Sequence, residues 1–144
     1  MHRYQIILEY DGTFFYGFQI QKKVNTVQKF VQSIISKILK EKIQIVGSGR
    51  TDRGVHSWGQ SAHFDTKKKI LNSRKLIQSL NFFLNKKLLS VIKIKKRNLN
   101  FHARYSAKER VYEYVLINRL ASPSIDKNKA WHIKKKLDLD LMKR

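Results

Sequence analysis

The sequence predicts an α+β fold with a split β-α-β (ferredoxin-like) arrangement, in which two helices pack on one face of an antiparallel sheet. Two observations carry this prediction. Apolar and polar residues alternate in several short segments, and apolar residues recur at helical spacing in two longer ones. These segments follow the order strand, helix, strand, strand, helix, strand, and then a further strand. We find neither an internal repeat nor a linker, so we expect one domain over residues 1–144 with one sheet face left for a ligand.

The first predicted strand covers residues 4–10, where alternation ends at Asp11-Gly12, a turn signal. A loop dense in aromatic residues follows. A helix is predicted next from one apolar stripe, with Asn25 as its cap and Gln28 reaching back as in a capping box. The stripe consists of Val27, Phe30, Val31, Ile34, Ile35, Ile38 and Leu39. Residues 43–46 then form a short strand, and residues 58–64 resume extended structure after a glycine-rich turn.

A second apolar stripe predicts another helix that begins near Asn72 or Ser73 and includes Leu76, Ile77, Leu80, Phe83 and Leu84. Residues 89–95 alternate as a strand, with Val91, Lys93 and Lys95 on one side and Ile92 and Ile94 on the other. Residues 110–118 are apolar on both faces, which predicts a central strand. Pro123 lies in a polar loop at 121–129, and 137–144 reads as the start of a helix.

The charge is strongly basic: 31 Lys and Arg against 10 Asp and Glu give a formal net charge of +21. Such an excess favours polyanionic partners, above all nucleic acid. A genome poor in G and C offers another explanation, because lysines outnumber arginines and many of them belong to solvated clusters. The chain has no cysteine, which excludes disulfides and thiolate chemistry. It also opens without a long apolar run, so we expect a cytoplasmic protein with no membrane segment.

One carboxylate, Asp52, lies between Arg50 and Arg53 in the glycine-rich stretch 47–64. In such a turn an aspartate usually bonds nearby backbone N–H groups, which is a structural role. The functional alternative is a nucleophile: a carboxylate can attack an electrophilic carbon, and neighbouring guanidinium groups favour its ionised form. Histidines 56 and 63 lie in the same stretch, but their spacing does not indicate convergence on a metal, so we expect no metal site.

Aromatic residues near this stretch have two interpretations. The rings of Phe14, Phe15, Tyr16 and Phe18 either cover the core or stack on bases beside a basic groove, with Phe18 favoured for the core. Tyr112 and Tyr114 point to the same side of the predicted central strand. Each is most simply a core ring, but an enzyme that extrudes a base needs a flat partner for it.

Several motifs together resemble the tRNA pseudouridine synthases of the TruA type. The pattern G-R-T-D-x-G-V-H-x-x-G-Q occupies residues 49–60, and EYDGTFFYGFQ occupies residues 9–19. Val27-Gln28 opens the first helix, and FHARYSA at 101–107 precedes RVYEY at 110–114. The similarity runs from Tyr4 to about Asn118. It implies the ferredoxin- or RRM-like sheet of pseudouridine synthases.

The resemblance also implies an activity: isomerisation of uridines at positions 38–40 of the tRNA anticodon stem-loop, without metal or organic cofactor and in a homodimer. Asp52 aligns with the essential aspartate of the family, Arg50 with the arginine that pairs with it, and Tyr112 with the tyrosine that stacks on the uracil. We also expect Arg53, Arg104 and His102 to bind substrate.

Two departures from the family pattern stand out. Position 53 is commonly alanine in the family, whereas Arg53 adds a charge here. Family members also continue into a second α/β half, and nothing after Trp131 resembles it. We therefore expect the N-terminal half of such an enzyme, as a fragment, a truncated product or a reduced form. The rival hypotheses are a non-catalytic RNA-binding relic and, less well supported, a small basic ribosome-associated protein.

Overall fold

The computed structural model describes residues 1–143, and its contacts divide the chain into two compact units, Met1–Lys108 and Glu109–Arg144. The sequence suggested a single domain over residues 1–144. Each unit is described by itself below.

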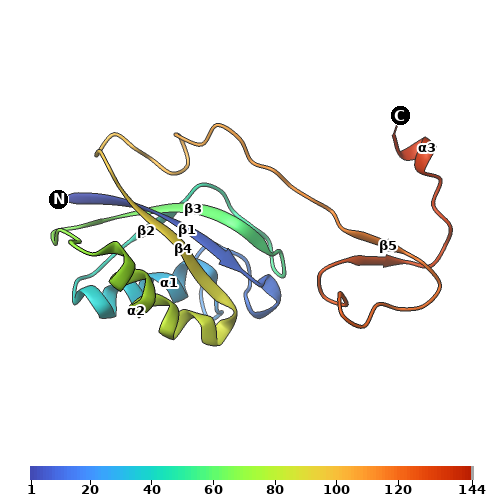
Figure 1. The fold of residues 1–144 in the computed structure, drawn as a ribbon, viewed down its shortest axis with the longest axis horizontal. Helices are drawn as coiled ribbons and strands as arrows, with labels where there is room; N and C mark the ends of the chain where they lie inside the picture. Colours follow the sequence, from blue (N-terminus) through green and yellow to red (C-terminus); the bar gives the residue numbers. More distant parts are fainter. Residues whose placement is uncertain (144) are drawn as a thin grey trace. The chain divides into compact units, whose positions relative to one another are not determined.

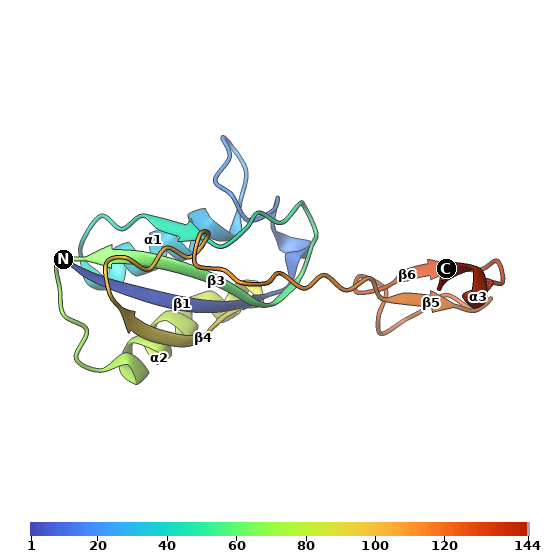
Figure 2. The same ribbon diagram turned by 90° about the horizontal axis from the view of Figure 1, so that it is seen from above.

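The first unit is a four-stranded antiparallel sheet with both long helices on one face (Figures 1 and 2). The strands lie in the order β2-β3-β1-β4, so the first strand of the chain is central. Their bounds are β1 His2–Tyr10, β2 Ile45–Gly47, β3 Ser57–Thr66 and β4 Leu89–Arg97; the helices are α1 Val27–Leu39 and α2 Ser73–Leu84. Single 3₁₀ turns cover Gly12–Phe14 and Asn85–Lys87. The predicted α+β fold is confirmed.

The core lies between this sheet and the two helices. Alternate residues of β1 point into it, because successive side chains of a strand face opposite sides. These are Tyr4, Ile6, Leu8 and Tyr10. The helices contribute every fourth residue, namely Val27, Val31 and Ile35 from α1 and Leu76, Leu80 and Leu84 from α2. The helical stripes read from the sequence are therefore the buried faces.

The cap of α1 differs from the prediction. Thr26, not Asn25, is the N-cap, and its hydroxyl accepts a hydrogen bond from the Lys29 amide. Gln28 forms no capping box, because its side chain bridges the Ile20 amide and the Ile45 carbonyl. For α2, the predicted start is confirmed: the Asn72 side chain caps the Lys75 amide.

A β-bulge in β4 changes the predicted alternation of that strand. Ile7 of β1 is opposite Lys93, but Leu8 is opposite Val91, so Ile92 is the extra residue. The predicted grouping of Val91 with Lys93 and Lys95 is therefore wrong. The bulge lets Val91 and Ile94 both enter the core while the two lysines stay outside.

The second unit contains a two-stranded parallel sheet of β5 (Leu116–Asn118) and β6 (Trp131–Ile133), followed by α3 (Leu139–Met142). The prediction of a central strand over 110–118 is wrong, since only its last three residues form a strand. Tyr112 and Tyr114 lie before it and are 65% and 88% exposed, so neither is a core ring. Pro123 does lie in a loop, and the C-terminal helix begins at Leu139.

Among residues 1–143, no helix has both the length and the apolar character needed to cross a bilayer.

Candidate active site at the Asp52 turn

Asp52 lies in the turn that connects β2 to β3, and its side chain is exposed. Its carboxylate forms no hydrogen bond and no ion pair with any residue that the structure describes. The structural role considered for this aspartate, bonding of backbone N–H groups, is thus not what the side chain does. Only its main-chain carbonyl closes the turn, by accepting a bond of 3.2 Å from the Val55 amide. The acid is available to a ligand.

The turn is held by the aromatic loop that follows β1. The Phe18 amide donates to the Thr51 carbonyl at 3.0 Å, and the Gly54 amide donates to the Phe15 carbonyl at 3.4 Å. These two bonds lie on either side of Asp52 in the sequence. Since both phenylalanines are buried, the loop fixes the backbone around the acid to the hydrophobic core.

Two glycines shape this contact between the loop and the turn, and Gly17 shows how close it is. Gly17 has a φ of +81°, and a Cβ on it would lie 2.5 Å from the Thr51 carbonyl oxygen. Gly54 has a similar φ of +80°, but a Cβ there would meet nothing within 4 Å. Gly17 is therefore needed for both conformation and space, whereas Gly54 is needed for conformation alone.

Polar side chains that the sequence analysis did not assign complete the support. The Tyr10 hydroxyl lies 3.0 Å from the Thr51 hydroxyl. His56 Nδ1 accepts a bond from the Gly12 amide at 3.1 Å and lies equally close to an Asp11 carboxylate oxygen. Gln60 donates to the Gly49 carbonyl at 3.0 Å and so fixes the other side of the turn. The spacing of His and Gln in the motif at 49–60 was the available signal for two of these roles.

The two arginines that flank the acid do not bind it. Arg50 is exposed and forms no ion pair with Asp52. The guanidinium of Arg53 stacks over the Tyr16 ring, 4.3 Å from its centroid. The aromatic loop divides in two: Phe15 and Phe18 enter the core, as expected for Phe18, whereas Phe14 and Tyr16 stay half-exposed. Stacking of Phe14 or Tyr16 on bases stays a prediction.

The remaining predicted residues of the first unit lie in the segment that follows β4. His102 Nδ1 accepts bonds from the amides of Arg104 and Tyr105, and its ring contacts the rings of Tyr105 and His63. The Arg104 guanidinium lies 6.0 Å from the Tyr105 ring centroid. His102 thus organises its own turn.

His63 joins this segment to the sheet. The Ala103 amide donates to His63 Nδ1 at 3.1 Å, and both residues are buried. Burial, together with the positive charge of Arg3 and the nearby His102, lowers the pKa of His63 to about 4. The neutral ring can accept the bond from Ala103, so this contact is made by the form present at neutral pH.

Arg3 holds the same segment from the other side. Its guanidinium binds both carboxylate oxygens of Asp65 at 2.7 Å and the carbonyls of Leu99 and Phe101, also at 2.7 Å. The bond from Arg3 holds the pKa of Asp65 below its usual range. Tyr112 belongs to the second unit. Among residues 1–143, no three His, Asp or Glu side chains are grouped as metal ligands.

Comparison with known proteins identifies the family of this chain. A family model described as tRNA pseudouridine synthase matches residues 6–106, which include the Asp52 turn, the loop that holds it and the His102 segment. The chain belongs to this family.

Curated relatives agree. The chain is 57% identical over 144 residues to tRNA pseudouridine synthase A of Pelagibacter ubique, covering 100% of this chain and 58% of that protein. It is 40% identical over 141 residues to tRNA pseudouridine synthase A of Neorickettsia sennetsu, covering 98% of this chain and 58% of the relative. For the protein of the same name from Caulobacter vibrioides the identity is 37% over 142 residues, covering 99% and 57%. The chain thus spans somewhat over half the length of these relatives.

Proposed function

We propose that this chain, or a longer protein that contains it, isomerises uridine to pseudouridine in tRNA, with Asp52 as the catalytic nucleophile. The observation that supports this most is the state of the Asp52 carboxylate. It is exposed and unbound by described residues, yet its backbone is tied on both sides to a loop anchored in the core. The Asp52 side chain is thus held in position by its backbone, while its carboxylate oxygens are bound to no described residue and can react with a substrate.

The proposed reaction uses the Asp52 carboxylate as nucleophile. Asp52 attacks C1′ of the ribose, and the glycosidic N1–C1′ bond breaks with its electron pair leaving on the uracil ring. The detached base turns, its C5 bonds to C1′, Asp52 is released, and the C5 proton is lost while N1 gains one. Reactant and product are isomers, so the balance requires no oxidant, reductant or cofactor.

Other side chains have proposed roles around that step. Arg50 helps to displace the base and to orient the acid, and Tyr112 stacks on the extruded uracil. Arg53 binds a phosphate near the target nucleotide; its stacking on Tyr16 supports this role because it holds the guanidinium in place. His102 and Arg104 contribute to substrate binding on the segment that follows β4.

We propose the anticodon arm of tRNA as the substrate, with the uridines at positions 38–40 as targets, and a cytoplasmic homodimer as the working state. The names of the relatives support the tRNA, and the resemblance of the motifs supports the rest. The strong positive charge of the chain fits an RNA substrate. Sedimentation of the chain at several concentrations tests the dimer.

Substitution of Asp52 tests the function. In a single-turnover assay on an unmodified tRNA transcript, Asp52→Asn should lower pseudouridine formation by at least about 10³-fold, because the amide is a poor nucleophile. Binding of the tRNA should stay within about threefold. Asp126→Asn, an exposed acid of the second unit, is the matched control and should keep full activity. Turnover by a clean Asp52→Asn preparation would overturn the role of Asp52.

A second candidate is RNA binding without catalysis. The observation that favours it is the formal net charge of +21, because such a charge supports binding of a polyanion whether or not catalysis follows. The same assay separates the two candidates: a wild-type chain of 144 residues that binds tRNA but forms no pseudouridine supports a binding module.

A further inference from the structure

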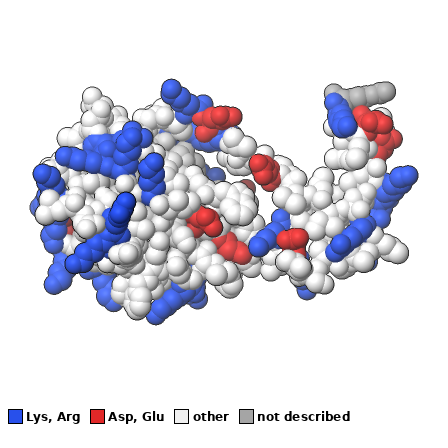
Figure 3. All heavy atoms as spheres, in the orientation of Figure 1, with Lys and Arg blue, Asp and Glu red and all other residues white. Residues whose placement is uncertain are grey.

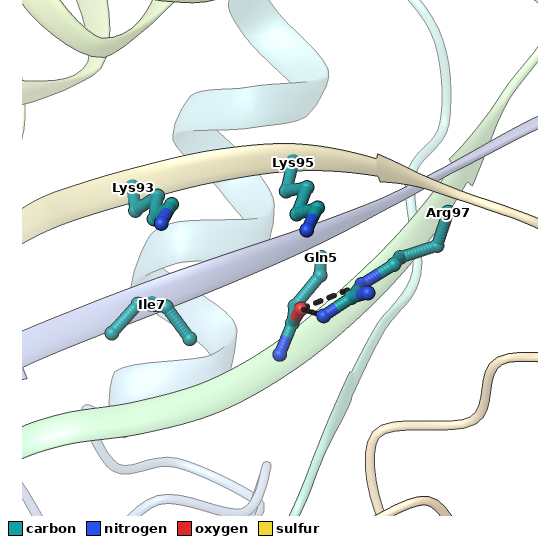
Figure 4. A pocket seen from close by; sticks show the side chains of 5 residues that line it. All are labelled: Gln5, Ile7, Lys93, Lys95 and Arg97. Carbon is teal, nitrogen blue, oxygen red and sulfur yellow. Dashed lines mark hydrogen bonds between the residues drawn. The ribbon is translucent and has the colours of Figure 1, made fainter.

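A second feature lies on the open face of the sheet, the face away from α1 and α2. Here β1 and β4 border a hollow of about 240 Å³ lined by Gln5, Ile7, Lys93, Lys95 and Arg97. Figure 4 shows both lysines projecting from β4 to the side on which Gln5 and Ile7 lie, with the Arg97 guanidinium reaching toward Gln5. Basic side chains are also spread over the face of residues 1–108 seen in Figure 3, so charge alone does not distinguish this hollow.

What distinguishes this hollow is that hydrogen bonds fix the position of its arginine, Arg97. Gln5 Oε1 accepts bonds from Nε and Nη2 of Arg97, at 2.9 and 2.7 Å. The other end of the Gln5 amide donates to the Ser61 hydroxyl at 2.8 Å, which fixes the amide so that its oxygen faces Arg97. The guanidinium carbon also lies 5.0 Å from the centroid of the Phe101 ring. Residues from β1, β3 and the segment after β4 therefore hold one side chain of β4 in place.

This arginine still has donors to offer. Nη1 of Arg97 bonds to no residue that the structure describes. Arg3, which is opposite Arg97 in the ladder, is different: its guanidinium is occupied by Asp65 and two main-chain carbonyls. Asp65, on β3, is in turn occupied by Arg3, and Glu9, an acid of β1, is opposite Ser90 toward the far end of that strand. The Arg97 side chain is therefore fixed in place by a neutral partner, Gln5, and its positive charge is not neutralised by a carboxylate of the described residues.

Spacing indicates the ligand. Residues 93, 95 and 97 alternate on one face of a strand, so their Cα atoms lie about 7 Å apart. A row of three positive charges fits a polymer with a regularly repeated negative charge. Arginine can bind a phosphate through two N–H groups, whereas lysine acts as a point charge.

We propose that this hollow binds successive phosphates of an RNA strand, with Arg97 as the anchor, Gln5 as the residue that positions it, and Lys93 and Lys95 as its neighbours. The inference rests on the proposed function only in taking that RNA to be tRNA.

The test is binding of the full 144-residue chain to a fluorescent anticodon stem-loop transcript across a range of salt concentrations. Arg97→Gln should raise the Kd about tenfold and reduce the slope of log K against log salt by about one, because one fewer counterion is released. Gln5→Leu keeps every charge and should raise the Kd about threefold by releasing Arg97. Arg74→Gln removes the same charge from an exposed position of α2 and should change the Kd less than twofold.

Equal effects of Arg97→Gln and Arg74→Gln would overturn the proposal, because the protein would then respond to total charge alone. An unchanged Kd for Gln5→Leu would overturn the positioning role of Gln5. If thermal unfolding shows that Arg97→Gln is misfolded, Lys95→Gln carries the same test, since Lys95 is exposed. A wild-type chain that shows the Arg97 effect but forms no pseudouridine would refute catalysis by these 144 residues alone and would leave this binding site standing.

Discussion

The two units of the chain differ sharply in how their residues are held. Every buried hydrophobic residue of the core belongs to Met1–Lys108, and the last of them is Ala103. In the described part of Glu109–Arg144, Pro123 is the one buried residue. Large side chains such as Leu120 and Ile125 are 82% and 90% exposed there.

This difference bears on the proposed site. Asp52 and Arg97 belong to the unit with a core, and hydrogen bonds tie the backbone of the first and the side chain of the second. Tyr112 belongs to the other unit, precedes β5 and is exposed. The acid and the basic hollow are therefore preorganised by packing, whereas the proposed base-stacking ring is not fixed by its own unit.

The largest difference between the two units should appear when a leucine side chain is shortened in each. Leu80 is fully buried in α2, so Leu80→Ala should lower the free energy of unfolding by about 2–5 kcal/mol. Leu141→Ala, at a position 64% exposed in α3, should change it by less than about 0.5 kcal/mol. Urea unfolding followed by circular dichroism measures both. Equal losses would mean that the second unit packs as tightly as the first.

Low pH should weaken the contact between His63 and the Ala103 amide, which joins the segment after β4 to the sheet. His63 has a pKa of about 4 in the folded chain and about 6.5 when unfolded, so between these values the unfolded state binds the extra proton. The contribution of His63 to the free energy of unfolding should therefore be constant above about pH 6.5 and fall by up to roughly 3 kcal/mol as the pH drops to about 4.

Substitution at this position supplies the control. His63→Asn retains an acceptor for the Ala103 amide but does not titrate, so the part of the decline due to His63 should disappear. His132→Asn, in the second unit, should leave the decline intact. A decline of the same size in His63→Asn would assign the acid sensitivity to other groups.

Two glycines sharpen the account of how the Asp52 turn is held. Gly17→Ala meets both an unfavourable φ and the Thr51 carbonyl, and it should cost about 2–3 kcal/mol of stability and lower pseudouridine formation. Gly54→Ala meets only the unfavourable φ and should cost about 1 kcal/mol. Thermal unfolding compares the two variants. Equal costs would show that contact between the loop and the turn contributes little.

The smallest effect should come from removing the second unit. A chain that ends at Lys108 keeps every residue of the hydrophobic core and should unfold within about 0.5 kcal/mol of the full chain. Urea unfolding of both chains measures this difference. A loss of several kcal/mol would reveal that the core depends on residues after 108.

Much of the first unit could be predicted because its apolar periods report burial directly. The stripes of α1 and α2 and the alternation of β1 needed no knowledge of tertiary structure. The bulge at Ile92 could not be read in this way, because it depends on the residues opposite it in β1. The predicted capping box of α1 is absent for a similar reason, since the Gln28 side chain bonds to Ile20 and Ile45, which both lie outside the helix.

The site shows the same limit. The G-R-T-D motif located Asp52, but the sequence did not show that Arg53 would stack on Tyr16 or that Arg50 would form no ion pair with the acid. Both outcomes depend on where the loop of residues 11–18 places its rings. The prediction of a strand over residues 110–115 was wrong because an apolar pattern indicates which side chains favour burial but does not identify the element that would cover them.

The bulge at Ile92 has a consequence for solubility. β4 is an edge of the four-stranded sheet, and the exposed backbone of an edge strand can recruit strands from other molecules. A bulge interrupts the regular hydrogen-bond spacing that such recruitment requires, and Lys93, Lys95 and Lys96 add repulsion between like copies. This edge is thereby protected against edge-to-edge aggregation.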